Sequence, residues 1–149
     1  MLYRAGPVNI YVRIKTRFGL RLSEWMIAVQ TLLYGVILLL PYDTFDSSPV
    51  YSYARHIVSE NVLGGVMAFF GVLRLVGLTV NGARQDITPW IRVVSAGAGF
   101  MLFSILLFSF ALSGIPSGWI AICIPILVVE IINVYRAAHD VGEYGAHVA

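Results

Sequence analysis

The sequence predicts an all-α, polytopic membrane protein with four transmembrane helices and both termini in the cytoplasm. Hydrophobic residues make up 58% of the 149 residues and charged residues only 12%, about half the charged share of a soluble domain. Mean hydropathy is +0.81. The apolar residues fall in runs of about 20, the length that crosses a ~30 Å hydrocarbon core. The net charge of +2 is too small to indicate a nucleic-acid partner.

Four apolar runs define the predicted helices. The first ends at Pro41, the second at Asn81-Gly82, and the third opens after Pro89. Such residues stop or start helices. The turn "SGIPSG" joins the third helix to the fourth. The predicted helices are 25–40, 62–80, 90–112 and 118–135, and together they form a transmembrane bundle (23–136). A basic cytoplasmic segment (1–22) precedes the bundle, and a short cytoplasmic tail (137–149) follows it.

The distribution of lysine and arginine predicts the orientation. Cytoplasmic loops carry an excess of these residues. One side of the four predicted helices has only Arg55, which lies near Asp43, Asp46 and Glu60. The other side has Arg4, Arg13, Lys15, Arg17, Arg21, Arg84, Arg92 and Arg136. Both termini are therefore expected in the cytoplasm.

The N-terminal segment "VNIYVRIKTRFGLRL" alternates apolar and basic residues. Period two favours an extended strand, yet Arg13, Arg17 and Arg21 also fit one side of a helix. With Lys15, these residues could lie on an anionic inner leaflet, each contributing about 1 kcal/mol. The segment is either an anchor that fixes topology, or a contact with a specific partner or a second copy.

Two opposite charges lie at one depth in the predicted bundle. Arg74 is about 10 Å from the cytoplasmic end of the second helix, and Glu130 about 9 Å from that of the fourth. A charge that faces lipid costs several kcal/mol. We therefore expect Arg74 and Glu130 to turn inward and pair.

Other small and polar residues lie near that depth and complete a predicted polar layer. Small residues let membrane helices approach closely, and polar ones hydrogen-bond between helices. The predicted polar layer holds Arg74, Glu130, Gln30, Asn133 and Ser95, and the predicted helix-packing residues are Gly71, Gly77, Gly97 and Gly99.

The pair has alternative interpretations. Arg74 could instead extend toward the headgroups, and Glu130 could be protonated because desolvation raises a carboxyl pKa. A buried pair can specify packing or mark a functional site. Elsewhere, His56 and Glu60 are interpreted as an exposed pair at the start of the second helix.

Metal binding is not predicted at the C-terminal tail. His139, Glu143 and His147 have the i, i+4, i+8 spacing of one helix face. Gly142 and Gly145, however, make this segment a poor helix.

The segment "GVLRLVGLTVNGARQDITPWIRVVSA" (71–96) resembles small membrane proteins encoded by phages. An arginine-bearing apolar helix, an Asn-Gly turn, a basic residue, a proline and an arginine that opens the next helix make up the pattern. The residues that carry it are Arg74, Asn81, Gly82, Arg84, Pro89 and Arg92. The resemblance implies a phage origin, a place in the cytoplasmic (inner) membrane of a bacterium and, in its sharpest form, holin-like permeabilisation of that membrane. The basic cluster, however, is N-terminal, which departs from the usual holin pattern.

The sequence predicts a non-enzymatic protein with no cofactor. It contains no nucleophile motif with an adjacent base and no phosphate-binding glycine loop. We expect it to act in the bilayer as a homo-oligomer or with a membrane-protein partner. The alternative from another class is a small ion- or proton-coupled transporter that uses Glu130.

Overall fold

The computed structural model describes residues 21–80 and 88–148, with side chains for 21–79 and 90–141. The all-helical prediction is confirmed for this part of the chain, where four helices are long and apolar enough to span a membrane. The long helices are α2 (Leu22–Leu39), α5 (Glu60–Val80), α6 (Thr88–Leu112) and α7 (Trp119–Val148), and the short ones are α3 (Thr44–Ser47), η2 (Pro49–Tyr51) and α4 (Ala54–Ile57). The basic residues Arg13, Lys15 and Arg17, and the question of strand or helix for residues 8–20, lie outside the described residues.

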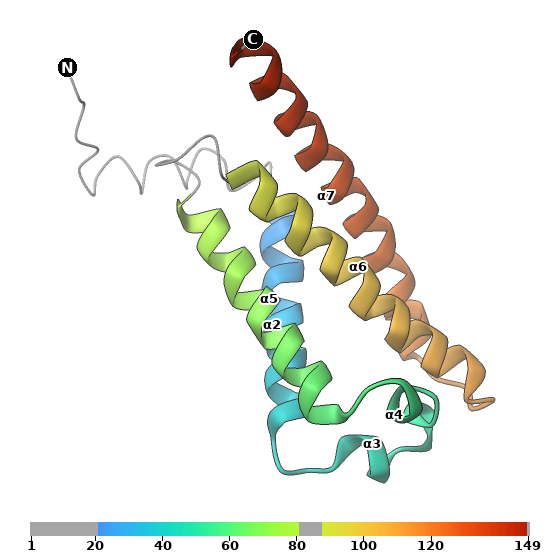
Figure 1. Cartoon of the computed structure of the whole chain (residues 1–149). Coiled ribbons are helices and arrows are strands. Elements are labelled where there is room, and N and C mark those ends of the chain that lie inside the picture. The colour runs from blue at the N-terminus through green and yellow to red at the C-terminus, as the bar shows by residue number, and fades with distance from the viewer. Residues whose placement is uncertain (1–20, 81–87, 149) are drawn as a thin grey trace.

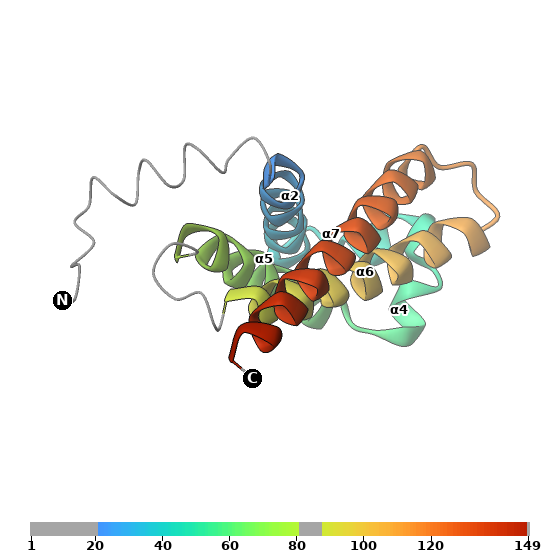
Figure 2. The same ribbon diagram turned by 90° about the horizontal axis from the view of Figure 1, so that it is seen from above.

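The long helices pack as two pairs. α2 lies mainly against α5, α7 lies mainly against α6, and contacts between α5 and α6 join the pairs. α2 and α7 meet at few points, and the view from above shows α7 lying across α6 while α2 stands beside α5 (Figure 2). One side of the bundle is therefore less closed than the others.

The short helices form a cap at one end of the bundle, which we define as residues 41–59. The start of α2 and the end of α7 lie at the opposite end (Figure 1). We call the half of the bundle beside the cap the cap half and the other the terminal half. Within the described residues, the first and last of the four long helices thus have their outer ends at one end of the bundle, and the side of the membrane on which this end lies stays a prediction.

The cap is fixed to the long helices by hydrogen bonds. The Glu60 carboxylate accepts from the backbone N–H groups of Thr44 and Phe45, at 2.8 and 2.9 Å, and so caps the start of α3. The Ser109 hydroxyl accepts from the N–H of Ala54 and donates to the carbonyl of Val50, both at 3.0 Å. Glu60 is therefore not part of an exposed pair with His56, because its carboxylate satisfies backbone donors that α3 leaves open.

A buried tyrosine contact links the cap to α2. The hydroxyl groups of Tyr34 and Tyr51 lie 2.7 Å apart. Burial raises the pKa of Tyr51 above its ordinary value, which favours the protonated phenol. The Tyr51 ring also stacks on Phe45, with ring centres 5.0 Å apart.

The cap half has an apolar core. Side chains from all four long helices meet there with the cap residues Phe45 and Tyr51. The core members on the long helices include Leu38, Leu63, Met67, Leu102, Phe103, Leu106, Phe110, Cys123 and Ile126. Buried polar and charged side chains gather instead mostly in the terminal half.

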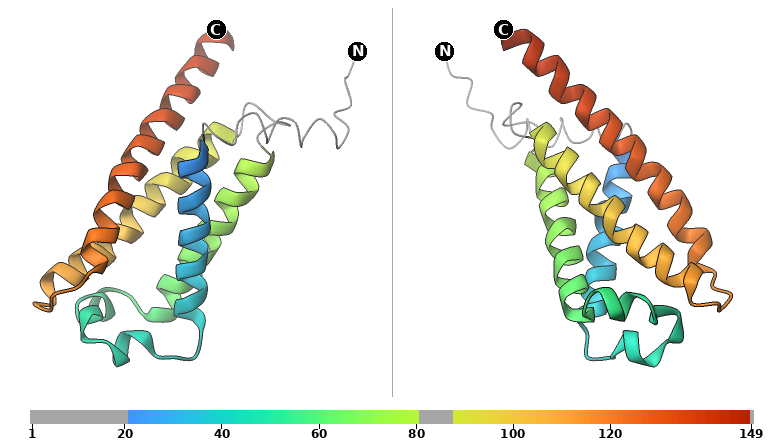
Figure 3. Two further views of the ribbon diagram at one scale, coloured as in Figure 1. Left: turned by 180° about the vertical axis from the view of Figure 1, so that it is seen from behind. Right: turned by 45° about the vertical axis from the view of Figure 1, so that its right-hand side comes forward.

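Helix α7 is longer than the sequence predicts. It continues beyond Tyr135 to Val148, and its last turns project past the start of α6 (Figures 1 and 3). Gly142 and Gly145 each cost about 1 kcal/mol relative to alanine. Extending an existing helix needs no new nucleus, so the long spanning part of α7 can carry these turns.

Candidate functional site

The centre of the terminal half holds a pair of charges, Arg74 of α5 and Glu130 of α7. The two terminal guanidinium nitrogens of Arg74, Nη1 and Nη2, donate to the two carboxylate oxygens of Glu130, at 2.6 and 2.8 Å. The Arg74 side chain is 4% exposed and the Glu130 side chain is 0% exposed. This two-fold geometry is the strongest form of an arginine–carboxylate contact. It leaves neither charge facing lipid.

Gly99 of α6 makes room for this pair. A Cβ at Gly99 would collide with the Glu130 carboxylate oxygen Oε1 and would lie 3.7 Å from Arg74 Nη1. The ion pair therefore lies against bare α6 backbone. Three helices meet at this point, although only two of them supply charges.

Asn133 adds to the pair from one turn along α7. Its side-chain amide donates to Glu130 Oε2 at 3.3 Å. The amide oxygen is buried and has no hydrogen-bond partner among the described residues. One buried acceptor beside the ion pair is thus open to a water or another donor.

Ser95 and Gln30, the two other members of the predicted polar layer, make no contact with the Arg74–Glu130 pair that the structure shows. Ser95 is buried, but its hydroxyl donates to the Arg92 carbonyl of its own helix at 3.3 Å. Gln30 was predicted in the polar layer around Arg74 and Glu130, but it lies outside that layer and lines a groove between α2 and α7. Its depth along α2 was readable from the sequence, but the side of the helix on which it lies was not.

Of the predicted helix-packing glycines, some lie at close helix contacts and one does not. A Cβ at Gly71 would come within 2.7 Å of the Leu32 backbone, and one at Gly77 would lie 3.2 Å from the Ile91 side chain. A Cβ at Gly97 would meet nothing within 4 Å, so Gly97 differs from the prediction. The structure adds a contact between Gly35 and Gly64, where a Cβ at Gly35 would lie 2.7 Å from the Gly64 carbonyl oxygen.

A second group of charges, which we call the end cluster, joins three helices near their terminal ends. Arg92 of α6 donates to both carboxylate oxygens of Glu24 of α2, at 2.9 and 2.7 Å. It also donates to the Asp140 carboxylate of α7. Arg92 and Glu24 are both buried. Sequence reasoning counts Arg92 only among the basic residues of the cytoplasmic side and does not predict the end cluster. The signal that could have revealed it is Glu24, an acidic residue near the start of the first helix.

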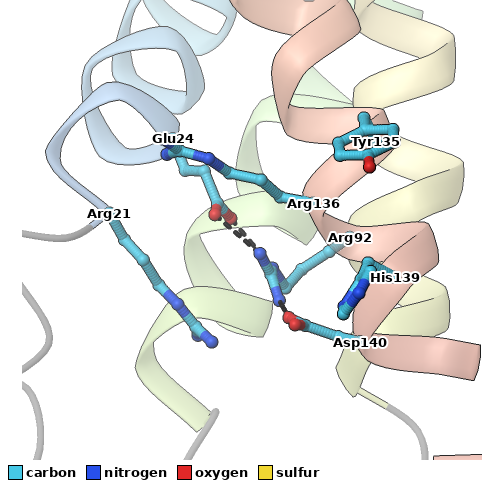
Figure 4. A pocket seen from close by; sticks show the side chains of 7 residues that line it. All are labelled: Arg21, Glu24, Arg92, Tyr135, Arg136, His139 and Asp140. Carbon is cyan, nitrogen blue, oxygen red and sulfur yellow. Dashed lines mark hydrogen bonds and ion pairs between the residues drawn. The ribbon is translucent and has the colours of Figure 1, made fainter. Parts of the chain in front are cut away.

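A charged pocket of about 320 Å³ adjoins the end cluster. Arg21 and Glu24 line it from the α2 side, and Arg136 and Asp140 line it from α7 (Figure 4). The full lining is Arg21, Glu24, Arg92, Tyr135, Arg136, His139 and Asp140. Cations and carboxylates line this pocket together, so its wall is polar rather than apolar.

An apolar groove runs along α2 toward Trp119 of α7. Its lining is Leu22, Trp25, Met26, Val29, Gln30, Leu33, Tyr34, Ile37 and Trp119, and its volume is about 620 Å³. Gln30 is half-buried in this groove, and its amide has no hydrogen-bond partner among the described residues. In a hydrocarbon environment such an amide favours contact with another polar group.

The described side chains offer no group of three histidine, cysteine or carboxylate residues that could hold a metal ion. His139 lies beside Asp140 in the charged pocket. The side chains of Glu143 and His147 are outside the described residues.

No protein-family model matches the chain, and comparisons with curated proteins and with solved structures found no match. The resemblance to small phage membrane proteins therefore stays a prediction. The arguments for function come from the geometry alone.

Proposed function

We propose that the chain is a non-enzymatic protein of the bacterial cytoplasmic membrane that acts by self-association in the bilayer. The observation that carries the proposal is Gln30, a glutamine in a membrane-spanning helix whose amide has no partner within the described chain. It lies in an apolar groove on the open side of the bundle, where α2 and α7 barely meet. Lipid tails would leave this amide without a hydrogen bond.

A second copy of the chain is the occupant that fits Gln30 best. A glutamine amide both donates and accepts hydrogen bonds. In a two-fold dimer the same surface meets itself, so the two Gln30 amides can pair reciprocally. The apolar side chains along the groove supply the surrounding contacts, with Trp25, Leu33 and Ile37 among them.

The distribution of charge along the bundle supports an orientation with both termini in the cytoplasm. Arg21, Arg92 and Arg136 lie together at the terminal end of the bundle. At the cap end Arg55 pairs with Asp46 at 3.7 Å. By the excess of basic residues on the cytoplasmic side, the terminal end and both chain termini face the cytoplasm, and the cap faces outward.

The test is self-association of the full chain in phosphatidylcholine vesicles, measured by energy transfer between labelled copies. Gln30→Leu should weaken dimerisation about fivefold to thirtyfold, the equivalent of about 1–2 kcal/mol for lost interhelical hydrogen bonds. Gln30→Asn keeps the amide and should retain part of the affinity. Ser104→Ala is the matched control, because the Ser104 hydroxyl bonds to the Phe100 carbonyl of its own helix. Equal association by wild type and Gln30→Leu would contradict the proposal.

Permeabilisation is the sharper version of this function, suggested by the phage resemblance. Controlled expression in a bacterium, with endolysin co-expressed, should then collapse membrane potential and optical density together at a defined time. Steady growth with an intact potential, despite confirmed insertion, would argue against permeabilisation and leave association without pore formation.

A proton-coupled transporter is the second candidate, and one observation favours it. Ser95 and Asn133 are buried on α6 and α7, between Arg92 of the end cluster and Glu130 of the central pair, which are buried as well. Glu130→Gln should abolish coupled uptake in a transporter while insertion and folding persist. The two-fold bond from Arg74 opposes this candidate, because it stabilises the charged carboxylate.

A further inference from the structure

We infer that one water molecule binds between Ser95 of α6 and Asn133 of α7, beside the Arg74–Glu130 pair. The Asn133 amide oxygen, Oδ1, points to this site, because it is buried and accepts no hydrogen bond from the described residues. The Asn133 side chain is 1% exposed, so bulk water does not reach it. A buried acceptor without a donor is costly, and internal waters commonly supply the missing bond.

The direction of the open acceptor is fixed by Glu130. Asn133 Nδ2 donates to Glu130 Oε2 at 3.3 Å. The reverse orientation of the amide would bring Oδ1 to the carboxylate, where two acceptors would meet, and would take Nδ2 away from it. Because the amide group is planar, Oδ1 points away from the carboxylate that holds Nδ2. The missing partner is therefore a donor on the other side of the Asn133 amide.

Ser95 lies at the level of Asn133 in the neighbouring helix. α6 and α7 run in opposite directions (Figure 1), and the bare backbone of Gly99 lies against Glu130. Ser95 comes four residues before Gly99, and Asn133 comes three residues after Glu130. Each is thus about one turn from that contact, toward the terminal end. Both side chains are buried, so they share one level of the interior between α6 and α7.

The Ser95 hydroxyl also has an open acceptor. It donates to the Arg92 carbonyl at 3.3 Å, which is longer than a typical bond between a hydroxyl and an oxygen. Its oxygen accepts no hydrogen bond from the described residues, although a hydroxyl oxygen has two lone pairs. One water molecule has two O–H groups. It can donate one to Asn133 Oδ1 and the other to Ser95 Oγ.

A water fits this position better than a cation. The Glu130 carboxylate beside Asn133 already accepts from both terminal nitrogens of Arg74. It therefore has no uncompensated charge to offset the desolvation of an ion, whereas a neutral donor adds no charge. The water completes a hydrogen-bonded chain from the Arg92 carbonyl to the central pair, with Ser95 and Asn133 as its links. α6, which supplies no charge to that pair, is thereby bonded to it.

The experiment detects the water by nuclear magnetic resonance on the full chain in detergent micelles. Asparagine is isotope-labelled, and the Asn133 side-chain amide is identified as the resonance that Asn133→Gln removes. Magnetisation transfer from water to the Nδ2 protons is measured in the rotating frame, where dipolar transfer from a bound water and proton exchange give cross-peaks of opposite sign. Wild type should show the dipolar cross-peak at Asn133. Its absence would overturn the water site.

Three serine variants test the bridge between the helices. Ser95→Ala removes one of the two partners of the water and should abolish most of the cross-peak, whereas Ser95→Thr keeps the hydroxyl and should retain it. Ser104→Ala is the matched control, because it removes from the same helix a hydroxyl that donates to the Phe100 carbonyl, and it should leave the cross-peak unchanged. Backbone amide spectra establish that each variant keeps the wild-type fold. A cross-peak of wild-type strength in Ser95→Ala would overturn the bridge.

Discussion

The two halves of the bundle are held together by different interactions. In the cap half, apolar side chains such as Phe103 and Leu106 pack with the cap, and hydrogen bonds from Glu60 and Ser109 fasten its backbone. In the terminal half, charges pair across helices instead, Arg74 with Glu130 and Arg92 with Glu24. Lipid tails are as apolar as leucine, so apolar burial alone does not select one helix neighbour over another.

The difference teaches how helix neighbours are specified in this chain. An ion pair in hydrocarbon can form only between two particular positions, and a wrong arrangement leaves a charge unpaired. Arg74–Glu130 links α5 to α7, while the end cluster links α6 to both α2 and α7. The ion pairs of the terminal half therefore tie the α2–α5 pair to the α6–α7 pair, and the cap half supplies close packing.

The largest effect expected in the cap half comes from its core. Phe103→Ala should destabilise the bundle by about 3–5 kcal/mol, because Phe103 is a fully buried member of the apolar core. Phe108→Ala removes the same side chain from a position that is 62% exposed on the bundle surface and should change stability far less. The measurement is unfolding in mixed micelles with increasing denaturing detergent. Similar losses in the two variants would show that the cap half has no specific core.

The next effect tests the close contact between α2 and α5. Gly35→Ala should cost about 1–3 kcal/mol, since its Cβ would collide with the Ala68 backbone nitrogen. Gly65→Ala, with nothing within 4 Å of its Cβ, is the matched control and should be neutral or slightly stabilising. A neutral Gly35→Ala in the same unfolding assay would mean that α2 and α5 are less closely packed than described.

The smallest effect concerns the fastening of the cap. Glu60→Gln keeps the side-chain length but weakens the two charge-assisted bonds to the start of α3, and should cost about 1 kcal/mol. Asp46→Asn, at an exposed pair with Arg55, should cost little. Proteolysis of the cap gives the readout, with faster cleavage expected only in Glu60→Gln. Faster cleavage in both variants would point to a general charge effect.

The sequence predicts the spanning helices well because apolar length is a one-dimensional property. It also brings Arg74 and Glu130 to one depth, since both interrupt apolar runs. The depth of a residue along a helix does not tell which side of the helix it faces. For this reason the sequence predicts Gln30 in the polar layer and Gly97 in a helix contact, and the structure shows neither. Charges near helix ends, such as Glu24 and Arg92, can also be satisfied by water, so their burial could not be read from position. The short cap helices are too brief to show a periodic pattern.

The most direct test of the account is a double-mutant cycle on the central pair. Arg74→Leu and Glu130→Leu should each cost about 3–5 kcal/mol in detergent unfolding, because each leaves a buried charge unpaired. The double variant should recover much of the loss, giving a coupling energy well above 1 kcal/mol. If the two single losses simply add in the double variant, the charges do not act as a pair, and the terminal half is not specified by them.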